Sequence, residues 1–129
     1  MRIVKRILIL DNDSASLDIM EEILSGEGFD VITAEDTSDI FLLIARHSPD
    51  ILIMDYILSG TNGGELCRQV KANKATGHLP VIIISAFSRI AASIYQCGCD
   101  DFIDKPFDIF DLINRVKAFA DKASYSKQE

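Results

Sequence analysis

The 129-residue sequence lacks several features that would assign a protein to a specialised class. It contains no internal repeat, no low-complexity segment, no linker between domains and no apolar run that approaches the length of a membrane span. The apolar stretch at residues 7–10 is too short for a signal peptide and is followed at once by three polar residues. We therefore expect one compact cytoplasmic domain over residues 1–123, followed by a polar tail at residues 124–129.

Cysteine is scarce and has no metal-ligand spacing. The three cysteines are an odd number, Cys97-Gly98-Cys99 is too tightly spaced for a C-x-x-C motif, and no histidine lies nearby in the sequence. Disulfides are rare in the cytosol, so this set favours reduced thiols. We expect Cys67, Cys97 and Cys99 to be mostly packed in the interior.

Positive charge is in deficit. Thirteen lysine and arginine residues stand against twenty aspartate and glutamate residues, which gives a formal net charge of −7 at pH 7. Binding to nucleic-acid phosphates needs a basic face, so this balance argues against a nucleic-acid partner. It suits a site that holds a divalent cation, although a solvated acidic surface is the commoner cause of such a balance.

Four short apolar runs each end on polar residues. They are residues 7–10, followed by Asp11, Asn12 and Asp13; residues 51–54, followed by Asp55; residues 81–84, followed by Ser85 and Ala86; and residues 102–103, followed by Asp104, Lys105 and Pro106. Such runs, rich in isoleucine and valine, are typical of parallel strands covered by helices on both faces. Ligands of these sheets bind beyond the carboxyl ends of the strands. The sequence therefore gathers carboxylates, a hydroxyl and one lysine along a single crevice.

Apolar residues with helical spacing alternate with these runs and with a further expected strand at residues 29–34. The helical positions are Leu17, Met20, Ile23 and Leu24; Ile40, Phe41 and Ile44; Leu66, Cys67 and Val70; Ile90, Ala91 and Ile94; and Ile109, Leu112, Ile113, Val116, Phe119 and Ala120. We expect Thr37 or Ser38 to cap the second helix, Pro49 to follow its end, and residues 59–64 to form a turn.

Five strands that alternate with five helices predict an α/β fold with a doubly wound parallel sheet and right-handed crossovers. We predict the flavodoxin-like strand order 2-1-3-4-5, in which the first and third strands are neighbours. Asp11 and Asp55 would then end adjacent strands, whose backbones are roughly 4.8 Å apart.

In this order and spacing, the motifs resemble the receiver domains of bacterial two-component response regulators. The segments that carry the resemblance are residues 7–13, 49–55, 82–86 and 100–107, so it covers essentially the whole chain. Each motif alone is weak, because an aspartate at a strand end is often only a helix cap or turn residue. Four motifs in register are strong. The strand order given above is partly taken from this resemblance, because the family is an established example of it.

The resemblance implies that Asp55 is a phosphoacceptor. One carboxylate oxygen would attack a phosphoryl group carried by a phosphohistidine of a sensor histidine kinase or phosphotransfer protein, giving an acyl phosphate. The implied cofactor is Mg²⁺, with Asp11, Asn12, Asp55 and the backbone carbonyl of Ile57 as its ligands. Catalysis would consist mainly of positioning and charge neutralisation.

Five further residues have implied roles. Lys105 would pair with the acceptor carboxylate at rest and with phosphoryl oxygens afterwards. Ser85 would offer its hydroxyl to the phosphoryl group, and the small Ala86 would leave room for that group. A cis peptide bond before Pro106 would aim the lysine inward. Phe102 stands at the position of the family's switch aromatic and would move together with Ser85.

The implied function is a signalling switch in a phosphorelay, not an enzyme. The domain would assist its own Mg²⁺-dependent phosphorylation and dephosphorylation. Switching would pass through the fourth strand, fourth helix and fifth strand to a downstream protein target. A homodimer through the fourth helix, fifth strand and fifth helix is an option, and neither a membrane nor a nucleic acid is expected as a partner.

Two alternatives come from other functional classes. A receiver-like docking module that is never phosphorylated is motivated by Asn12. A flavodoxin-like FMN protein would share the sheet topology, but it needs a Ser/Thr/Gly loop after the first strand to hold a phosphate. Asp11 and Asp13 would repel that phosphate, so we disfavour the FMN alternative.

Asn12 departs from the family pattern, because this position usually carries the second acid of a pair and a direct metal ligand. An amide oxygen can coordinate Mg²⁺ but brings no charge. We therefore expect an Asn12→Asp variant to bind Mg²⁺ more tightly than the wild type, with phosphorylation possible in both. A Mg²⁺ titration of the two proteins measures this, and equal affinities would contradict the prediction.

Overall fold

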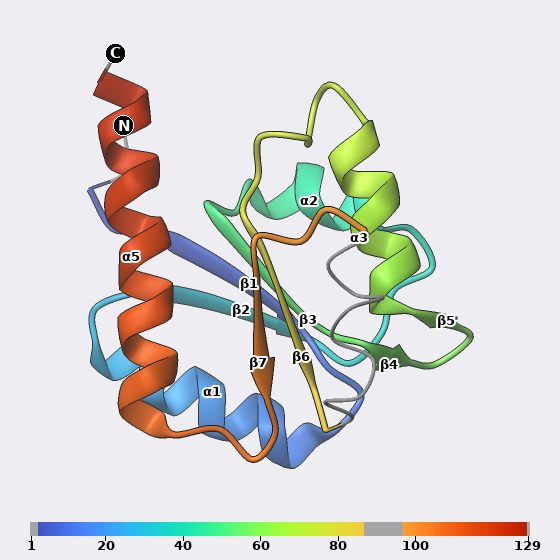
Figure 1. The fold of residues 1–129 in the computed structure, drawn as a ribbon, viewed down its shortest axis with the longest axis horizontal. Coiled ribbons are helices and arrows are strands. Elements are labelled where there is room, and N and C mark those ends of the chain that lie inside the picture. The colour runs from blue at the N-terminus through green and yellow to red at the C-terminus, as the bar shows by residue number, and fades with distance from the viewer. Residues whose placement is uncertain (1–2, 87–96, 129) are drawn as a thin grey trace.

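A computed structural model describes residues 3–86 and 97–128, with side chains up to residue 121. Its main sheet has five parallel strands in the order β2-β1-β3-β6-β7, flanked by helices (Figure 1). The strands are β1 (Arg6–Leu10), β2 (Asp30–Ala34), β3 (Ile51–Asp55), β6 (Val81–Ser85) and β7 (Asp101–Asp104). The helices are α1 (Ser14–Gly26), α2 (Ile40–His47), α3 (Gly63–Ala72) and α5 (Ile109–Gln128).

The arrangement of the five strands is the predicted one, although their labels differ. The labels differ because two short strands, β4 (Ile57–Leu58) and β5 (Thr61–Asn62), form a separate antiparallel hairpin where only a turn was predicted. The described residues contain four helices rather than the predicted five. The predicted fourth helix, with Ile90, Ala91 and Ile94, lies at residues 87–96, outside the described residues.

Successive side chains along the central strands point to opposite faces of the sheet and form two apolar layers. On one face, α1 and α5 pack on β1, β3 and β6 through Leu17, Met20, Leu24, Leu112, Val116, Ala120, Ile7, Ile9, Ile53 and Ile82. On the other, α2 and α3 pack on the same strands through Ile40, Ile44, Leu66, Val70, Leu8, Leu52, Met54 and Ile83. Burial on both faces explains why the sequences of these strands are continuous apolar runs.

Aspartate, rather than the predicted Thr37 or Ser38, caps α2. The Oδ1 atom of Asp39 accepts hydrogen bonds from the backbone amides of Phe41 and Leu42, at 3.0 and 3.2 Å. The Thr37 hydroxyl instead accepts a hydrogen bond from the Asp39 amide at 3.1 Å. Thr37, Ser38 and Asp39 can all cap a helix, so the predicted N-terminus of α2 was one or two positions too early.

The last helix differs from its prediction at both ends. Leu112, Val116 and Ala120 are buried as expected, but Ile109 is exposed in the first turn. The backbone of α5 continues to Gln128, so the helix includes most of the polar stretch at residues 124–129. This stretch has no glycine or proline to end the helix, and Lys127 and Gln128 are good helix formers. Within the described residues, neither α5 nor any other helix is long and apolar enough to cross a membrane.

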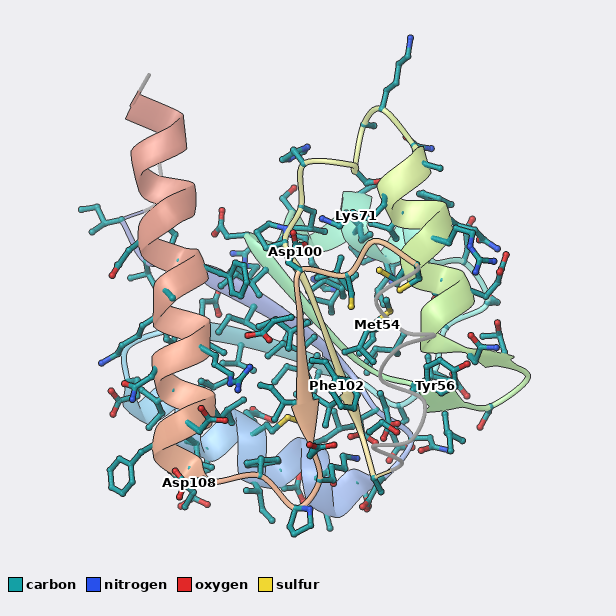
Figure 2. The ribbon with its side chains drawn as sticks, in the orientation of Figure 1. Met54, Tyr56, Lys71, Asp100, Phe102 and Asp108 are labelled. Atoms are coloured by element: carbon teal, nitrogen blue, oxygen red, sulfur yellow. The ribbon has the colours of Figure 1, made fainter. Side chains whose placement is uncertain are left out.

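Ion pairs anchor the start of β7 to helices on both faces of the sheet. Lys71 of α3 binds the Asp100 carboxylate at 2.6 Å (Figure 2), and the same carboxylate accepts the Val81 amide at 2.8 Å. Arg115 of α5 binds the neighbouring Asp101 at 2.7 Å. The strand that leads to Lys105 therefore has a fixed entry.

The three cysteines meet between α3 and the loop before β7. All are buried thiols, as predicted, and the Cys67 thiol lies 3.8 Å from the carbonyl oxygen of Cys97. Burial raises the pKa of Cys67 and raises the pKa of Cys99 to about 12, and the neighbouring Cys97 thiol adds to both shifts. Because the thiolate is the nucleophile, these raised pKa values keep Cys67 and Cys99 inert, and burial shields Cys97 from reagents.

We expect iodoacetamide near pH 8.5, the ordinary pKa of a thiol, to leave the folded protein unmodified and to label all three cysteines after unfolding in urea. Folding raises the pKa values of Cys67 and Cys99. The contribution of these two shifts to stability is therefore present below the ordinary pKa of a thiol and is lost as the pH rises above it. Mass spectrometry counts the labels. Rapid labelling of a single cysteine in the native protein would contradict the prediction.

Candidate functional site

Three charged side chains meet at the carboxyl edge of the sheet. The Lys105 ammonium donates hydrogen bonds to Oδ2 of Asp11 and Oδ2 of Asp55, each at 2.7 Å. Asp11 follows β1, Asp55 ends β3 and Lys105 follows β7. The topology thus joins residues that are 94 and 50 positions apart in the chain.

Backbone amides orient the two carboxylates. The amide of Asp13 donates to Oδ1 of Asp11, and the amide of Ile57 donates to Oδ1 of Asp55, both at 2.9 Å. Each carboxylate therefore has one oxygen on an amide two residues ahead and the other on Lys105. The side chains are 1% exposed for Asp11, 11% for Asp55 and 16% for Lys105, so the group is shielded from bulk water.

Burial and pairing have opposite effects on the charges. Burial raises the pKa of Asp11, and the hydrogen bond from Lys105 offsets only part of that rise. Burial by itself would lower the pKa of Lys105, but its hydrogen bonds to Asp11 and Asp55 outweigh this effect and raise the pKa. One ammonium facing two carboxylates leaves the ionised site with excess negative charge, which a cation can neutralise.

The other predicted site residues lie along the same edge. Ser85 ends β6, is fully buried, and its carbonyl accepts the Lys105 amide at 2.8 Å. Ala86 follows it and is exposed. The Lys105–Pro106 peptide bond is cis, as the resemblance implied.

Phe102 belongs to the apolar layer and not to the charged group. It is buried in the cluster that contains Met54, with half-buried Tyr56 packed against it (Figure 2). Its strand neighbour across the register is Ile83 of β6. The ring lies in the layer between the sheet and α3. In the sequence, Phe102 is three residues before Lys105.

Asn12 and Asp13 are exposed, unlike the buried Asp11 and Asp55. Asp13 caps α1: its Oδ1 accepts the Ala15 amide at 3.1 Å, and its Oδ2 accepts the Ser16 hydroxyl at 3.0 Å. The hydrogen bond from Ser16 lowers the pKa of Asp13. Asp13 is therefore committed to the helix N-terminus and does not replace the missing second acid.

The donor chemistry of the edge fits a sparse Mg²⁺ site. Among residues 3–86 and 97–128, no three histidine, cysteine, aspartate or glutamate side chains form a metal-binding group. Mg²⁺ commonly keeps several waters and uses only one or two protein carboxylates. Asp11 and Asp55 are two such carboxylates. The Asn12 amide, one residue after Asp11, and the Ile57 carbonyl, two residues after Asp55, would add neutral oxygens. These residues fit the ion, with less charge than a three-acid site.

Two contributions at Asp55 were not predicted. The Ile57 amide holds Asp55, and Gly63 packs against the Asp55 backbone. The consecutive glycines at 63 and 64, which are poor helix formers placed in a helix N-terminus, were the available signal for close packing.

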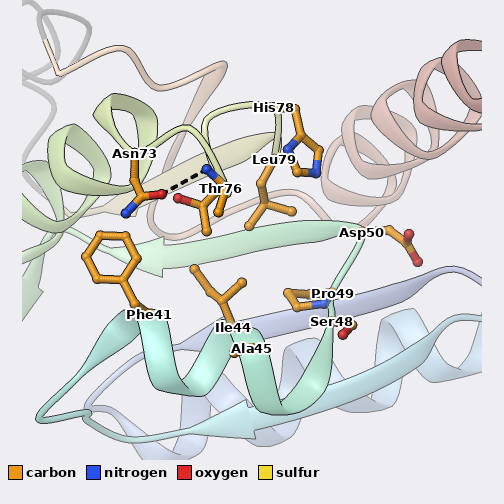
Figure 3. A pocket seen from close by; sticks show the side chains of 11 residues that line it. Phe41, Ile44, Ala45, Ser48, Pro49, Asp50, Asn73, Thr76, His78 and Leu79 are labelled. Carbon is orange, nitrogen blue, oxygen red and sulfur yellow. Dashed lines mark hydrogen bonds between the residues drawn. The ribbon is translucent and has the colours of Figure 1, made fainter.

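A cavity of about 470 Å³ lies at the opposite end of the sheet, between α2 and the loop from α3 to β6 (Figure 3). Asp50, just before β3, is among its lining residues. Two of its polar groups are already engaged: Asn73 accepts the Ala75 amide at 2.8 Å, and Thr76 donates to the Val70 carbonyl at 2.7 Å. This cavity is separate from the charged group.

Comparison with known proteins agrees with this geometry. Residues 7–117 match the response regulator receiver domain. The chain belongs to this family. Receiver domains are signalling switches of two-component systems, work with histidine kinases and downstream effectors, and generally bind Mg²⁺ at an acidic pocket.

Solved structures support the assignment. A protein from Chloroflexus aurantiacus assigned as a response regulator is 32% identical, with a TM-score of 0.83 over 90% of this chain and 97% of that one. The receiver domain of a histidine kinase from Syntrophus aciditrophicus is 26% identical, with a TM-score of 0.83 over 90% and 89%. The chemotaxis response regulator CheY4 of Vibrio cholerae, at 17% identity, shares the fold with a TM-score of 0.81 over 90% and 98%.

A Lys105→Met variant should lose stability in a pH-dependent way in metal-free buffer. Removing one partner of a buried ion pair costs about 3–5 kcal/mol, so we expect the free energy of unfolding to fall by about 3 kcal/mol near pH 7.5. Without the ammonium the pKa of Asp11 rises further, so the folded state binds a proton more tightly than the unfolded chain. Acidification to about pH 5 should therefore restore part of the loss.

Denaturant unfolding at the two pH values measures both effects. Lys117→Met is the matched control, because its ammonium pairs with Glu27 on the surface, where both side chains are at least a third exposed. Its loss should stay below about 1 kcal/mol at either pH. Equal losses in the two variants would contradict a buried, charged site at Lys105.

Proposed function

We propose that this receiver domain accepts a phosphoryl group on Asp55 from the phosphohistidine of a sensor histidine kinase or phosphotransfer protein. The observation that supports the proposal best is the Lys105 ammonium held 2.7 Å from both Asp11 and Asp55. A carboxylate beside a fixed positive charge, at the edge of the sheet where ligands bind, suits the attack on an anionic phosphoryl group.

The step is a displacement at phosphorus. A carboxylate oxygen of Asp55 forms the new O–P bond, the N–P bond to the donor imidazole breaks, and the imidazole keeps the electron pair and takes up a proton. The Ile57 amide holds Oδ1 of Asp55, so the carboxylate meets the donor in one orientation. Lys105 pairs with Asp55 before the reaction and with the phosphoryl oxygens after it.

Asp11, Asn12, Asp55 and the Ile57 carbonyl are the proposed holders of Mg²⁺. The bound ion would neutralise charge on the phosphoryl oxygens and on the two carboxylates. Asp11 is buried and already oriented by the Asp13 amide, so it offers a fixed oxygen to the cation. Lys105 also donates to Oδ2 of Asp11, so the cation and the ammonium would share this carboxylate.

Phosphorylation would act as a switch through the β6–β7 side of the domain. A phosphoryl group adds about two negative charges at pH 7 beside Lys105 and Ser85. Ser85 would donate its hydroxyl to that group, Ala86 would admit it, and Phe102 in the adjacent apolar layer would repack. The output would be a downstream protein target, or a second copy of the domain, that binds this side. Neither a membrane nor a nucleic acid is proposed as a partner.

A second candidate is a receiver-like docking module that is never phosphorylated. It is favoured by the exposed Asn12 and by the absence of a third acidic ligand from the described residues. In that case Lys105 and the two carboxylates would be a structural ion-pair network only. Direct phosphorylation separates the two candidates.

We expect acetyl phosphate with Mg²⁺ to add the mass of one phosphoryl group to the wild type and none to an Asp55→Asn variant. Asp108→Asn is the matched control and should be modified like the wild type. Asp108 is an exposed acid that caps α5, where its Oδ1 accepts the Asp111 amide at 2.9 Å, and asparagine caps helices equally well. Intact-protein mass spectrometry provides the readout. An unmodified wild type, or a modified Asp55→Asn variant, would reject the proposal in favour of the docking module.

A further inference from the structure

We infer that Gly63 is a positioning residue for Asp55, because α3 must approach the phosphoacceptor backbone more closely than any side chain allows. The inference rests on the proposed function for its consequence, namely the rate of phosphorylation. The geometry that supports it is independent of that function.

Gly63 closes a loop that begins and ends at the acceptor. The chain leaves Asp55, runs through the β4–β5 hairpin and returns at the first turn of α3. There the Gly63 amide donates to the Tyr56 carbonyl at 2.7 Å. A Cβ placed on Gly63 would overlap the Asp55 carbonyl oxygen and lie 3.1 Å from the Asp55 carbonyl carbon and 3.2 Å from the Tyr56 Cα.

The Asp55–Tyr56 peptide cannot retreat freely from such a Cβ. On its other side the Tyr56 amide donates to the Ile84 carbonyl of β6 at 2.9 Å. The end of β3 is therefore confined between β6 and the first turn of α3. A side chain at position 63 has to displace either the acceptor backbone or the helix.

The closed loop also determines how the Asp55 carboxylate is held. Ile57 pairs with Asn62 across the hairpin, and the Ile57 amide donates to Oδ1 of Asp55. Asn62 in turn caps α3 through its side-chain oxygen, which accepts the Glu65 amide at 2.7 Å. The position of α3 is thus transmitted through Asn62 and Ile57 to the orientation of the nucleophile.

A Gly63→Ala variant tests the inference, and Gly77→Ala is its matched control. Gly77 lies in the loop between α3 and β6. A Cβ on Gly77 would also be too close to backbone atoms, at 2.9 Å from the Lys71 oxygen and 3.1 Å from the Asn73 oxygen. Both variants should lose stability. Because a displacement of about 1 Å can slow a positioned reaction about 100-fold, we expect a loss of that order in the rate of Mg²⁺-dependent phosphorylation by acetyl phosphate for Gly63→Ala alone.

The second readout is the NMR chemical shift of the Ile57 amide, which reports its hydrogen bond to Asp55 in the absence of any phosphodonor. It should change in Gly63→Ala and stay at the wild-type value in Gly77→Ala. If Gly63→Ala does not fold, Asn62→Ala replaces it, and Asn62→Asp should restore both the shift and the rate because aspartate also caps a helix.

The outcomes separate this inference from the proposed function. A wild-type rate and an unchanged Ile57 amide in Gly63→Ala would overturn the inference, as would an equal loss of rate in Gly77→Ala at temperatures where both are folded. If the wild type itself takes up no phosphoryl group, the proposed function fails, and the Ile57 amide alone decides. A change in the Ile57 amide shift that is confined to the Gly63→Ala or Asn62→Ala variant still supports positioning. An unchanged Ile57 amide shift in these variants overturns the inference.

Discussion

The contact on which the site depends is the ammonium of Lys105 between two buried carboxylates. The Asp11 side chain is only 1% exposed and the Asp55 side chain 11%, so this ammonium and one backbone amide for each carboxylate provide most of the stabilisation of their charges. The same contact joins the ends of β1, β3 and β7. A change in the charge of one carboxylate therefore acts at once on three strands.

The two ends of the sheet are built differently. At the amino end, Arg6 pairs with Asp30, Lys71 with Asp100, and Arg115 with Asp101 at the entry of β7. These contacts hold strand entries to their neighbours and do not involve the proposed acceptor. At the carboxyl end a single ammonium serves two acids. The proposed phosphorylation would therefore act at the carboxyl end, whereas the ion pairs at the amino end hold neighbouring strands together.

The acidic site is sparse, and this affects how it would function. Asp13 is used as a helix cap, and Asn12 contributes no charge, so the cation would compete with Lys105 for only two carboxylates. In the proposed function, the close packing of α3 against the Asp55 backbone would restrict the orientation of the proposed nucleophile.

Local pattern determined which residues form most elements and which of them face the site. The run at residues 51–54 had to be a central strand because it is apolar on both faces, and the polar residues that end four such runs necessarily reach the same edge. The sequence pattern could not identify which of Thr37, Ser38 and Asp39 caps α2, because all three residue types can cap a helix. It also could not locate the end of α5, because no residue in its last turns stops a helix. Only the tertiary structure decided that Lys105 bridges both carboxylates and that Gly63 lies against Asp55, because these contacts depend on strand register and on the depth at which α3 packs.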